Sequence, residues 1–310
     1  MRPGLLLLVL AGCGPMGTGP PAPLTPGAVF LSRGDPFLPG PLEVTQRDLR
    51  EGELGAPKPV RVTAPTTPGT YPVVQFQHGF LSDRRTYDEI LGHLASHGFV
   101  VVAPQLYPAD GVPLGKMTAL EEAKAAKQVA DWAQAFAAAV MGSAADPRPL
   151  GVAGHSRGGK VTWLLTAQLG QPARGIVGVD PVDGRGGPLL SAQPEALPGP
   201  LDTAPPSLVV GMALGGACAP EGDNFQHFFD RTTPPTRLLL VKNQGHADML
   251  DADVGTAGLC AEGPDRKETR RVTGGALAAF FRWRLQDDEV ARSFLDSDLL
   301  TTLEVTRAAR

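Results

Sequence analysis

The sequence predicts an α/β fold with a mostly parallel central sheet, helices on both of its faces and no large helical cap. Short apolar runs alternate with segments of helical periodicity, which is typical of strands joined by crossover helices. Most of these runs are continuously apolar, as expected of strands that are covered on both faces. The expected strands are Val60–Thr63, Val73–Phe76, Phe99–Ala103, Leu150–Ala153, Ile176–Val179, Leu208–Val210 and Leu238–Val241.

The helical periodicity lies between these strands. In residues 118–140, Val129, Trp132 and Phe136 recur at three- and four-residue spacing, which gives one apolar face for packing on the sheet. The expected helices are Thr86–Ser96, Thr118–Val140, Gly158–Leu169 and Lys267–Leu285.

The stretch from Asp183 to Pro206 bears on access to a site. It is short and interrupted by several prolines, so it cannot form a helical lid. We expect a mobile loop beside an open cleft, which would admit a bulky substrate.

The overall composition favours one catalytic domain, residues 42–310, within a chain of 310 residues. The formal net charge is −4, and lysine and arginine are scattered rather than gathered in a run. A nucleic-acid partner is therefore not expected, because binding to phosphates requires a basic surface.

The N-terminus predicts export. Residues 1–12 resemble a signal peptide, with Arg2 followed by an apolar run that is too short to span a bilayer. The sequence Leu10-Ala11-Gly12-Cys13 resembles the lipobox of bacterial lipoproteins, which implies lipidation of Cys13. Residues 13–41 are dense in proline and glycine and are expected to form a tether. We therefore expect a membrane-anchored protein of the cell envelope; the alternative is a secreted or periplasmic protein with an incidental cysteine.

Two further cysteines, Cys218 and Cys260, remain as a pair if Cys13 carries lipid. An oxidising compartment would allow them to form a disulfide. Two buried free thiols are the alternative, because sequence alone does not give the distance between them.

The motif Gly154-His155-Ser156-Arg157-Gly158 directly follows an expected strand. The pattern G-x-S-x-G between a strand and a helix is typical of a nucleophile elbow, in which small flanking residues permit a tight turn that exposes the serine hydroxyl. Ser156 is therefore the candidate nucleophile of a serine hydrolase. A chance glycine-rich turn is the alternative interpretation.

A serine nucleophile needs a histidine base and a carboxylate that orients it, and this fold supplies them in the chain order serine, acid, histidine. His246 follows the last expected strand and is the candidate base, whereas its rival His227 precedes that strand. Asp180 ends an expected strand and is the candidate acid, with Asp183 as the alternative.

The tetrahedral intermediate of such a reaction needs hydrogen-bond donors for its oxyanion. The backbone N–H of Arg157, immediately after the nucleophile, is one candidate. Phe80 supplies the second, because it ends the sequence Gln77-His78-Gly79-Phe80 after an earlier strand, and Gly79 permits a close approach.

Several segments together resemble chlorophyllase, the esterase that removes phytol from chlorophyll. The resemblance runs from about Pro72 to Leu285, and the segment from Asp287 to Arg310 and the N-terminal signal and tether lie outside it. The segments that carry it are Pro72–Phe80, Ala95–Tyr107, Ala153–Lys160, Gly178–Gly184, Cys218–Gly222 and Gly245–Asp251.

This resemblance implies an α/β-hydrolase fold, no cofactor, and a serine, aspartate and histidine triad at Ser156, Asp180 and His246. The position of the acid is also similar to that in platelet-activating-factor acetylhydrolases. No metal site is expected, because the acids at positions 248, 251 and 253 do not have the spacing of an EF-hand loop.

The expected function is hydrolysis of a bulky or lipophilic carboxylic ester through an acyl-enzyme. A lipase, a phospholipid acetylhydrolase or a polyester hydrolase is the first alternative. A non-catalytic envelope lipoprotein that uses the fold for binding is the second.

Overall fold

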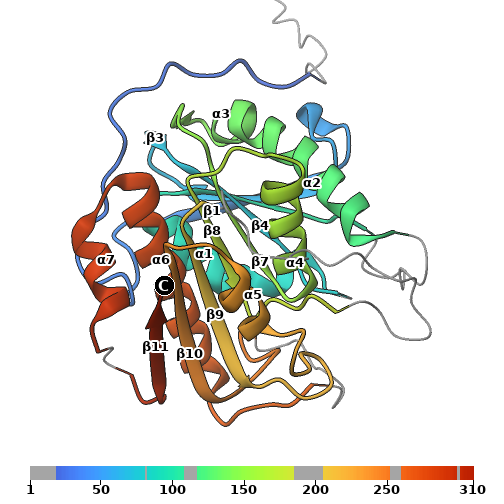
Figure 1. Cartoon of the computed structure of the whole chain (residues 1–310). Coiled ribbons are helices and arrows are strands. Elements are labelled where there is room, and N and C mark those ends of the chain that lie inside the picture. Colours follow the sequence, from blue (N-terminus) through green and yellow to red (C-terminus); the bar gives the residue numbers. More distant parts are fainter. Residues whose placement is uncertain (1–18, 81, 108–116, 185–204, 252–259, 299–300) are drawn as a thin grey trace, which may run out of the picture.

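A nine-stranded sheet forms the centre of the molecule (Figure 1), in a computed structural model that describes residues 19–80, 82–107, 117–184, 205–251, 260–298 and 301–310. Its strand order is β1-β2-β5-β4-β7-β8-β9-β10-β11, and β3 and β6 form a separate pair. The strands are β1 (Val44–Leu49), β2 (Val60–Pro65), β3 (Thr70–Tyr71), β4 (Val73–Gln77), β5 (Val100–Pro104), β6 (Ala144–Ala145), β7 (Gly151–His155), β8 (Gly175–Val179), β9 (Ser207–Leu214), β10 (Thr236–Gly245) and β11 (Val305–Ala309).

The sheet is parallel from β5 to β10 and antiparallel at both edges, where β1, β2 and β11 lie. Every expected strand is present, with ends shifted by a few residues. Strands β1 and β11 are not among the sequence predictions. Only Leu49 of β1 is buried and β11 has no buried residue, so neither strand has the apolar run that marks the others.

Helices cover both faces of the sheet. Helices α1 (Asp88–Ser96), α6 (Arg266–Gln286) and α7 (Glu289–Asp296) lie on one face. Helices α2 (Ala119–Trp132), α3 (Ala138–Val140), α4 (Arg157–Trp163) and α5 (Phe225–Arg231) lie on the other. Short π-helical turns, η3 (Ala133–Ala137) and η4 (Leu164–Gln168), extend α2 and α4, and short 3₁₀ turns lie at η1 (Glu53–Gly55) and η2 (Arg84–Tyr87).

The core is divided by the sheet into two apolar clusters. Side chains alternate between them along each strand: Val152 of β7 packs in the cluster with α2 and α4, and the next residue, Ala153, packs in the cluster with α1 and α6. Both sets are almost fully buried, which explains why the central strands are continuously apolar.

The folded body begins earlier than residue 42, so the expected tether is too long. Its second half packs on residues that come shortly before strands β4 and β5 in the chain: Gly27 N–H donates to Thr70 Oγ1 at 2.7 Å, and Ser32 Oγ lies 3.0 Å from Nδ1 of His97. Phe37 is only 3% exposed. Composition alone suggested an extended chain, but buried partners fix this segment. Residues 1–18, including Cys13, lie outside the described residues.

The parallel strands bring their carboxyl ends to one edge of the sheet. The chain leaves β4, β7, β8 and β10 there, at the loops that contain the candidate site residues. Among the described residues, no inserted helical lid covers this edge. No helix in this part of the chain is sufficiently long and apolar to cross a membrane. Most of the loop expected beside the cleft, residues 185–204, lies outside the described part of the chain.

Candidate active site

The turn between β7 and α4 holds Ser156 in a conformation that side chains rarely adopt, with φ 55° and ψ −123°. A Cβ on Gly154 would lie 2.3 Å from the carbonyl oxygen of Gly158, and a Cβ on Gly158 would lie 2.3 Å from that of Gln77. Glycine is therefore required on both sides of the serine. The turn has the strand-to-helix context and the backbone strain of a nucleophile elbow.

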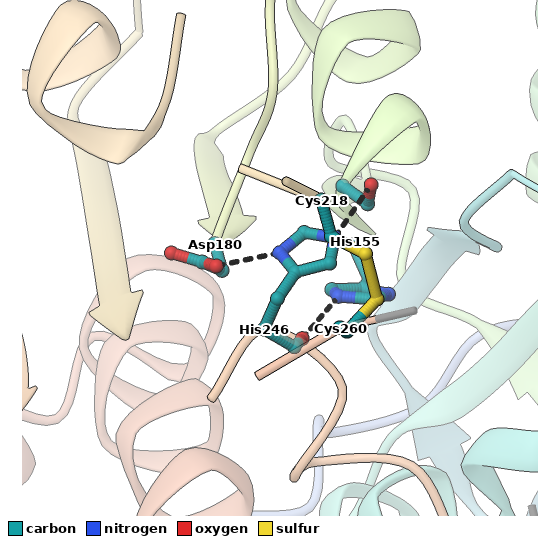
Figure 2. Close-up of a disulfide and its surroundings, with 6 residues drawn as sticks. His155, Asp180, Cys218, His246 and Cys260 are labelled. Carbon is teal, nitrogen blue, oxygen red and sulfur yellow. Dashed lines mark hydrogen bonds and ion pairs between the residues drawn. A yellow bond between two sulfur atoms is a disulfide. The ribbon is translucent and has the colours of Figure 1, made fainter. Parts of the chain in front are cut away.

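His246 lies between Ser156 and Asp180, as Figure 2 shows for the histidine and the acid. Its Nε2 is 2.9 Å from Ser156 Oγ, and its Nδ1 is 2.6 Å from Asp180 Oδ2. An ionised carboxylate only accepts hydrogen bonds, so Nδ1 carries the proton and Nε2 is left to accept the serine hydroxyl. The other oxygen of Asp180 accepts the Met212 N–H at 2.9 Å, which fixes the fully buried carboxylate.

Two acids hold the loop that follows His246. Asp248 Oδ2 accepts the N–H groups of Gly245 at 2.6 Å and Gly263 at 2.7 Å. Asp251 accepts the first N–H groups of α1, those of Asp88 and Glu89. Burial raises the pKa of both acids. This role could not be predicted from the sequence, because both acids lie in a loop without periodicity.

Gly79 and Phe80 lie beside the nucleophile. A Cβ on Gly79 would be 3.4 Å from the Ser156 Cβ, so this loop passes directly against the elbow. Arg157 begins helix α4, whose N-terminal N–H groups point away from the helix and favour negative charge. The Arg157 guanidinium lies 5.5 Å from the centre of the Phe80 ring. The two predicted oxyanion donors therefore belong to neighbouring residues.

The Arg157 side chain is anchored by a buried acid of α2. Its Nε donates to Glu122 Oε1 at 2.8 Å, and its guanidinium also donates to the Met117 carbonyl at 2.9 Å. Glu122 is 1% exposed, and burial raises its pKa. Glu122 is not among the residues predicted from the sequence, although a charged residue on the apolar face of a predicted helix is a signal of such a role.

The alternative acid and the rival base contact each other rather than Ser156. His227 Nε2 lies 2.9 Å from Asp183 Oδ2, and Lys160 Nζ lies 3.2 Å from Asp183 Oδ1. Asp183 is fully buried and Lys160 is 2% exposed, and burial lowers the pKa of the lysine. This group ties α4 and α5 to the segment after Asp180. Lys160 is a further residue that the sequence analysis did not select.

Three other histidines have structural contacts. His78 accepts the Leu106 N–H at Nε2 and is fully buried, and burial lowers its pKa to about 4. His93 and His97 hold the N-terminal segment through the carbonyl oxygens of Pro36 and Leu38.

Cys218 and Cys260 form a disulfide, with Cα atoms 5.3 Å apart. It joins the loop after β9 to the segment before α6, and the surroundings drawn in Figure 2 include His155, Asp180 and His246. The alternative prediction, two buried free thiols, is therefore wrong. In the described part of the chain, no cluster of three histidine, cysteine or acidic side chains has the arrangement of a metal site.

Comparison with known proteins gives consistent matches over most of the chain. The model of the chlorophyllase family matches residues 33–301. Chlorophyllase-2 of Arabidopsis thaliana is 32% identical over 260 residues, which cover 75% of this chain and 79% of that protein. Chlorophyllase-1 of the same plant is 35% identical over 273 residues, 78% of this chain and 81% of that protein. Chloroplastic chlorophyllase-1 of Citrus unshiu is 34% identical over 285 residues, 80% of this chain and 84% of that protein.

The family match is longer than the resemblance inferred from the motifs. It begins within the packed N-terminal segment and ends beyond α7, whereas the inferred resemblance spans residues 72–285. The residues from Asp287 to 301 therefore belong to the matched region.

Proposed function

The chain belongs to the chlorophyllase family of α/β-hydrolases, and we propose that it hydrolyses carboxylic esters through an acyl-enzyme on Ser156. One observation carries this proposal. A serine in a strained strand-to-helix turn is hydrogen-bonded to a histidine that is itself hydrogen-bonded to a buried carboxylate. This arrangement provides a nucleophile, a base with a defined tautomer and a group that stabilises the imidazolium.

In the acylation step, Ser156 Oγ attacks the ester carbonyl while His246 Nε2 takes the serine proton. The carbonyl oxygen becomes an oxyanion, which the N–H groups of Phe80 and Arg157 bind. As the intermediate collapses, the bond between the carbonyl carbon and the alcohol oxygen breaks, and His246 returns the proton to the departing alcohol. Asp180 keeps the imidazole oriented and stabilises its positive charge during this step.

In the deacylation step, His246 Nε2 takes a proton from water, and the resulting hydroxide attacks the acyl carbon. The same two N–H groups bind the second oxyanion. Ser156 then leaves with the proton from His246, and the carboxylic acid is released. No cofactor takes part in this scheme.

We propose that the ester is bulky or lipophilic. Phe80 and Met117 are partly buried at the carboxyl edge of the sheet, and Leu214, at the end of β9, is 36% exposed. Apolar side chains at the edge of the sheet that holds the nucleophile favour an apolar substrate. Chlorophyllase activity, suggested by the names of the relatives, is the leading candidate. Hydrolysis of triacylglycerols, phospholipid acetyl groups or polyesters is the alternative that these apolar residues also favour.

A substrate panel separates these activities. Rates on chlorophyll, on triacylglycerols of increasing chain length, on an acetylated phospholipid and on a soluble polyester would be compared at equal enzyme concentration. We expect chlorophyll to give the highest kcat/KM. A higher value on any other substrate would assign that activity instead.

Covalent labelling tests the nucleophile. A fluorophosphonate probe should label the wild-type protein and fail to label Ser156→Ala. Ser293→Ala is a matched control, because Ser293 lies on α7 and its hydroxyl donates to the Val290 carbonyl. Labelling of Ser156→Ala at the wild-type level would refute the assignment. Absence of labelling in the folded wild type would favour a non-catalytic binding protein.

We also propose that residues 1–12 direct export and that Cys13 carries a lipid anchor in the cell envelope. The support is the sequence Leu10-Ala11-Gly12-Cys13 and the short apolar run before it. Metabolic labelling with a radioactive fatty acid tests the proposal: wild type should be labelled and Cys13→Ala should not. Equal labelling of both would contradict it.

A further inference from the structure

A buried tyrosine and a buried histidine connect the two sides of the candidate active site. Tyr87, at the end of the η2 turn, has its hydroxyl 2.9 Å from Nδ1 of His155 and accepts the Gly79 N–H at 2.9 Å. His155 Nε2 lies 2.9 Å from the main-chain carbonyl oxygen of His246. Tyr87 is fully buried and His155 is 3% exposed.

The direction of each hydrogen bond follows from the chemistry of these groups. A carbonyl oxygen only accepts, so His155 Nε2 carries a proton and donates to His246. The Nδ1 atom of a neutral imidazole is then an acceptor, and the Tyr87 O–H donates to it. The tyrosine oxygen in turn accepts the Gly79 N–H. The chain of bonds is therefore consistent from the Gly79 main chain to that of His246.

Both side chains are neutral near pH 7. Burial lowers the pKa of His155 well below its ordinary value, and the nearby His246 lowers it further. Burial raises the pKa of Tyr87 to about 12. The His155 and His246 rings have centroids 4.7 Å apart, so a charged His155 would oppose the imidazolium that forms on His246 during the reaction.

This series of hydrogen bonds ends on two loops whose relative position matters for the reaction. Gly79 directly precedes Phe80, the candidate oxyanion donor, and a Cβ on Gly79 would lie 2.9 Å from His155 Nδ1. His246 is the candidate base. His155 is also covalently joined to Ser156, so nucleophile, base and oxyanion loop all meet at these two side chains.

We propose that Tyr87 and His155 are a positioning pair, which fixes the oxyanion loop relative to His246 and thereby supports the transition state rather than substrate binding. The inference rests on the proposed function and assigns no direct contact with substrate to either residue. Displacement of a reacting group by about 1 Å can cost on the order of 100-fold in rate.

The test compares Tyr87→Phe with Tyr71→Phe. The first removes the hydroxyl while keeping the ring, whose centroid lies 4.9 Å from that of Phe76. Tyr71 is a matched control, because its ring is buried and its hydroxyl donates to the Thr67 carbonyl, outside this chain of bonds. We expect Tyr87→Phe to lower kcat roughly 10- to 100-fold with KM changed less than twofold. Tyr71→Phe should retain the wild-type kcat.

The inference would be overturned by a kcat loss below threefold, by an equal loss in Tyr71→Phe, or by a change confined to KM. If Tyr87→Phe does not fold, His155→Gln and His155→Leu decide the matter. Glutamine keeps a donor for the His246 carbonyl and leucine does not, so His155→Gln should retain at least about tenfold more kcat. Equal kcat in both variants would overturn the inference.

Ser156→Ala belongs in the same series. If it retains activity, the proposed function fails, whatever Tyr87→Phe does. If it is inactive while Tyr87→Phe behaves as wild type, the positioning role alone fails.

Discussion

His246 Nδ1 lies 2.6 Å from Asp180 Oδ2, whereas His227 Nε2 lies 2.9 Å from Asp183 Oδ2. The described residues thus contain two aspartate and histidine pairs with fully buried acids, and these two acids are only three residues apart in the sequence. Only the first pair is hydrogen-bonded to the serine of the elbow. The second includes Lys160, which makes it an ion-paired cluster.

Loss of Asp180 should affect catalysis, whereas loss of Asp183 should affect stability. Asp180→Asn should fold and lose roughly 10⁴-fold in kcat, because the amide favours the wrong tautomer of His246. Asp183→Asn should lower the free energy of unfolding by about 3 to 5 kcal/mol, since Lys160 would stay buried without its carboxylate. Steady-state kinetics and urea unfolding measure the two effects. The reverse pattern would make Asp183 the acid of the reaction.

Gly158 should not tolerate a side chain. In Gly158→Ala the new Cβ would meet the Gln77 carbonyl oxygen at 2.3 Å, so β4 and the elbow would have to separate. We expect a loss of more than about 2 kcal/mol in unfolding free energy, together with loss of activity. Gly92→Ala is the control, because nothing lies within 4 Å of a Cβ there and alanine favours a helix. Equal stability of the two variants would contradict the close packing at Gly158.

The disulfide should stabilise the fold. It closes a segment with a sequence separation of 42 residues, and cross-linking a loop of this length restricts the unfolded chain by about 2 to 4 kcal/mol. Cys218→Ala with Cys260→Ala should therefore unfold at a lower urea concentration than wild type. Addition of a reductant should have little further effect on this double variant. A double variant as stable as the untreated wild type would disprove the contribution.

Acid should weaken the attachment of the N-terminal segment through His97. Burial lowers the pKa of His97 to about 4, against 6.5 in an unfolded chain. Above pH 6.5 the imidazole is neutral in both states. As the pH falls from 6.5 to about 4, the unfolded chain binds the proton and the folded protein does not, so stability falls, by at most about 3 kcal/mol.

Unfolding free energies at pH 7 and pH 4.5 test this expectation. His97→Gln should be less stable than wild type at pH 7, because it disturbs the contacts with Ser32 and Leu38. It should nevertheless lose less stability on acidification. The same pH-dependent loss in both proteins would show that the pKa of His97 is not lowered in the folded protein.

The central strands and the order of the site residues could be predicted from the sequence because they have local signals. Continuous apolar runs mark strands buried on both faces, and the sequence Gly154-His155-Ser156-Arg157-Gly158 marks the turn between β7 and α4. The fold class that these signals predicted is confirmed by the family match and by the parallel sheet.

Features that depend on contacts between distant segments were not predictable in this way. The packed segment around Phe37 has the composition of a linker, and only its partners on α1 and α6 bury it. The Tyr87 hydroxyl meets His155 although 68 residues separate them in the chain. The sequence leaves two alternatives for Cys218 and Cys260, a disulfide or two free thiols, because the distance between them depends on the fold.

The central claim is that Ser156 is the nucleophile of an ester hydrolase. Its most direct measurement is kcat for Ser156→Ala on a short-chain nitrophenyl ester, with circular dichroism to verify folding. We expect a fall of about 10⁴- to 10⁶-fold relative to wild type. A folded Ser156→Ala protein with kcat within tenfold of wild type would contradict the account.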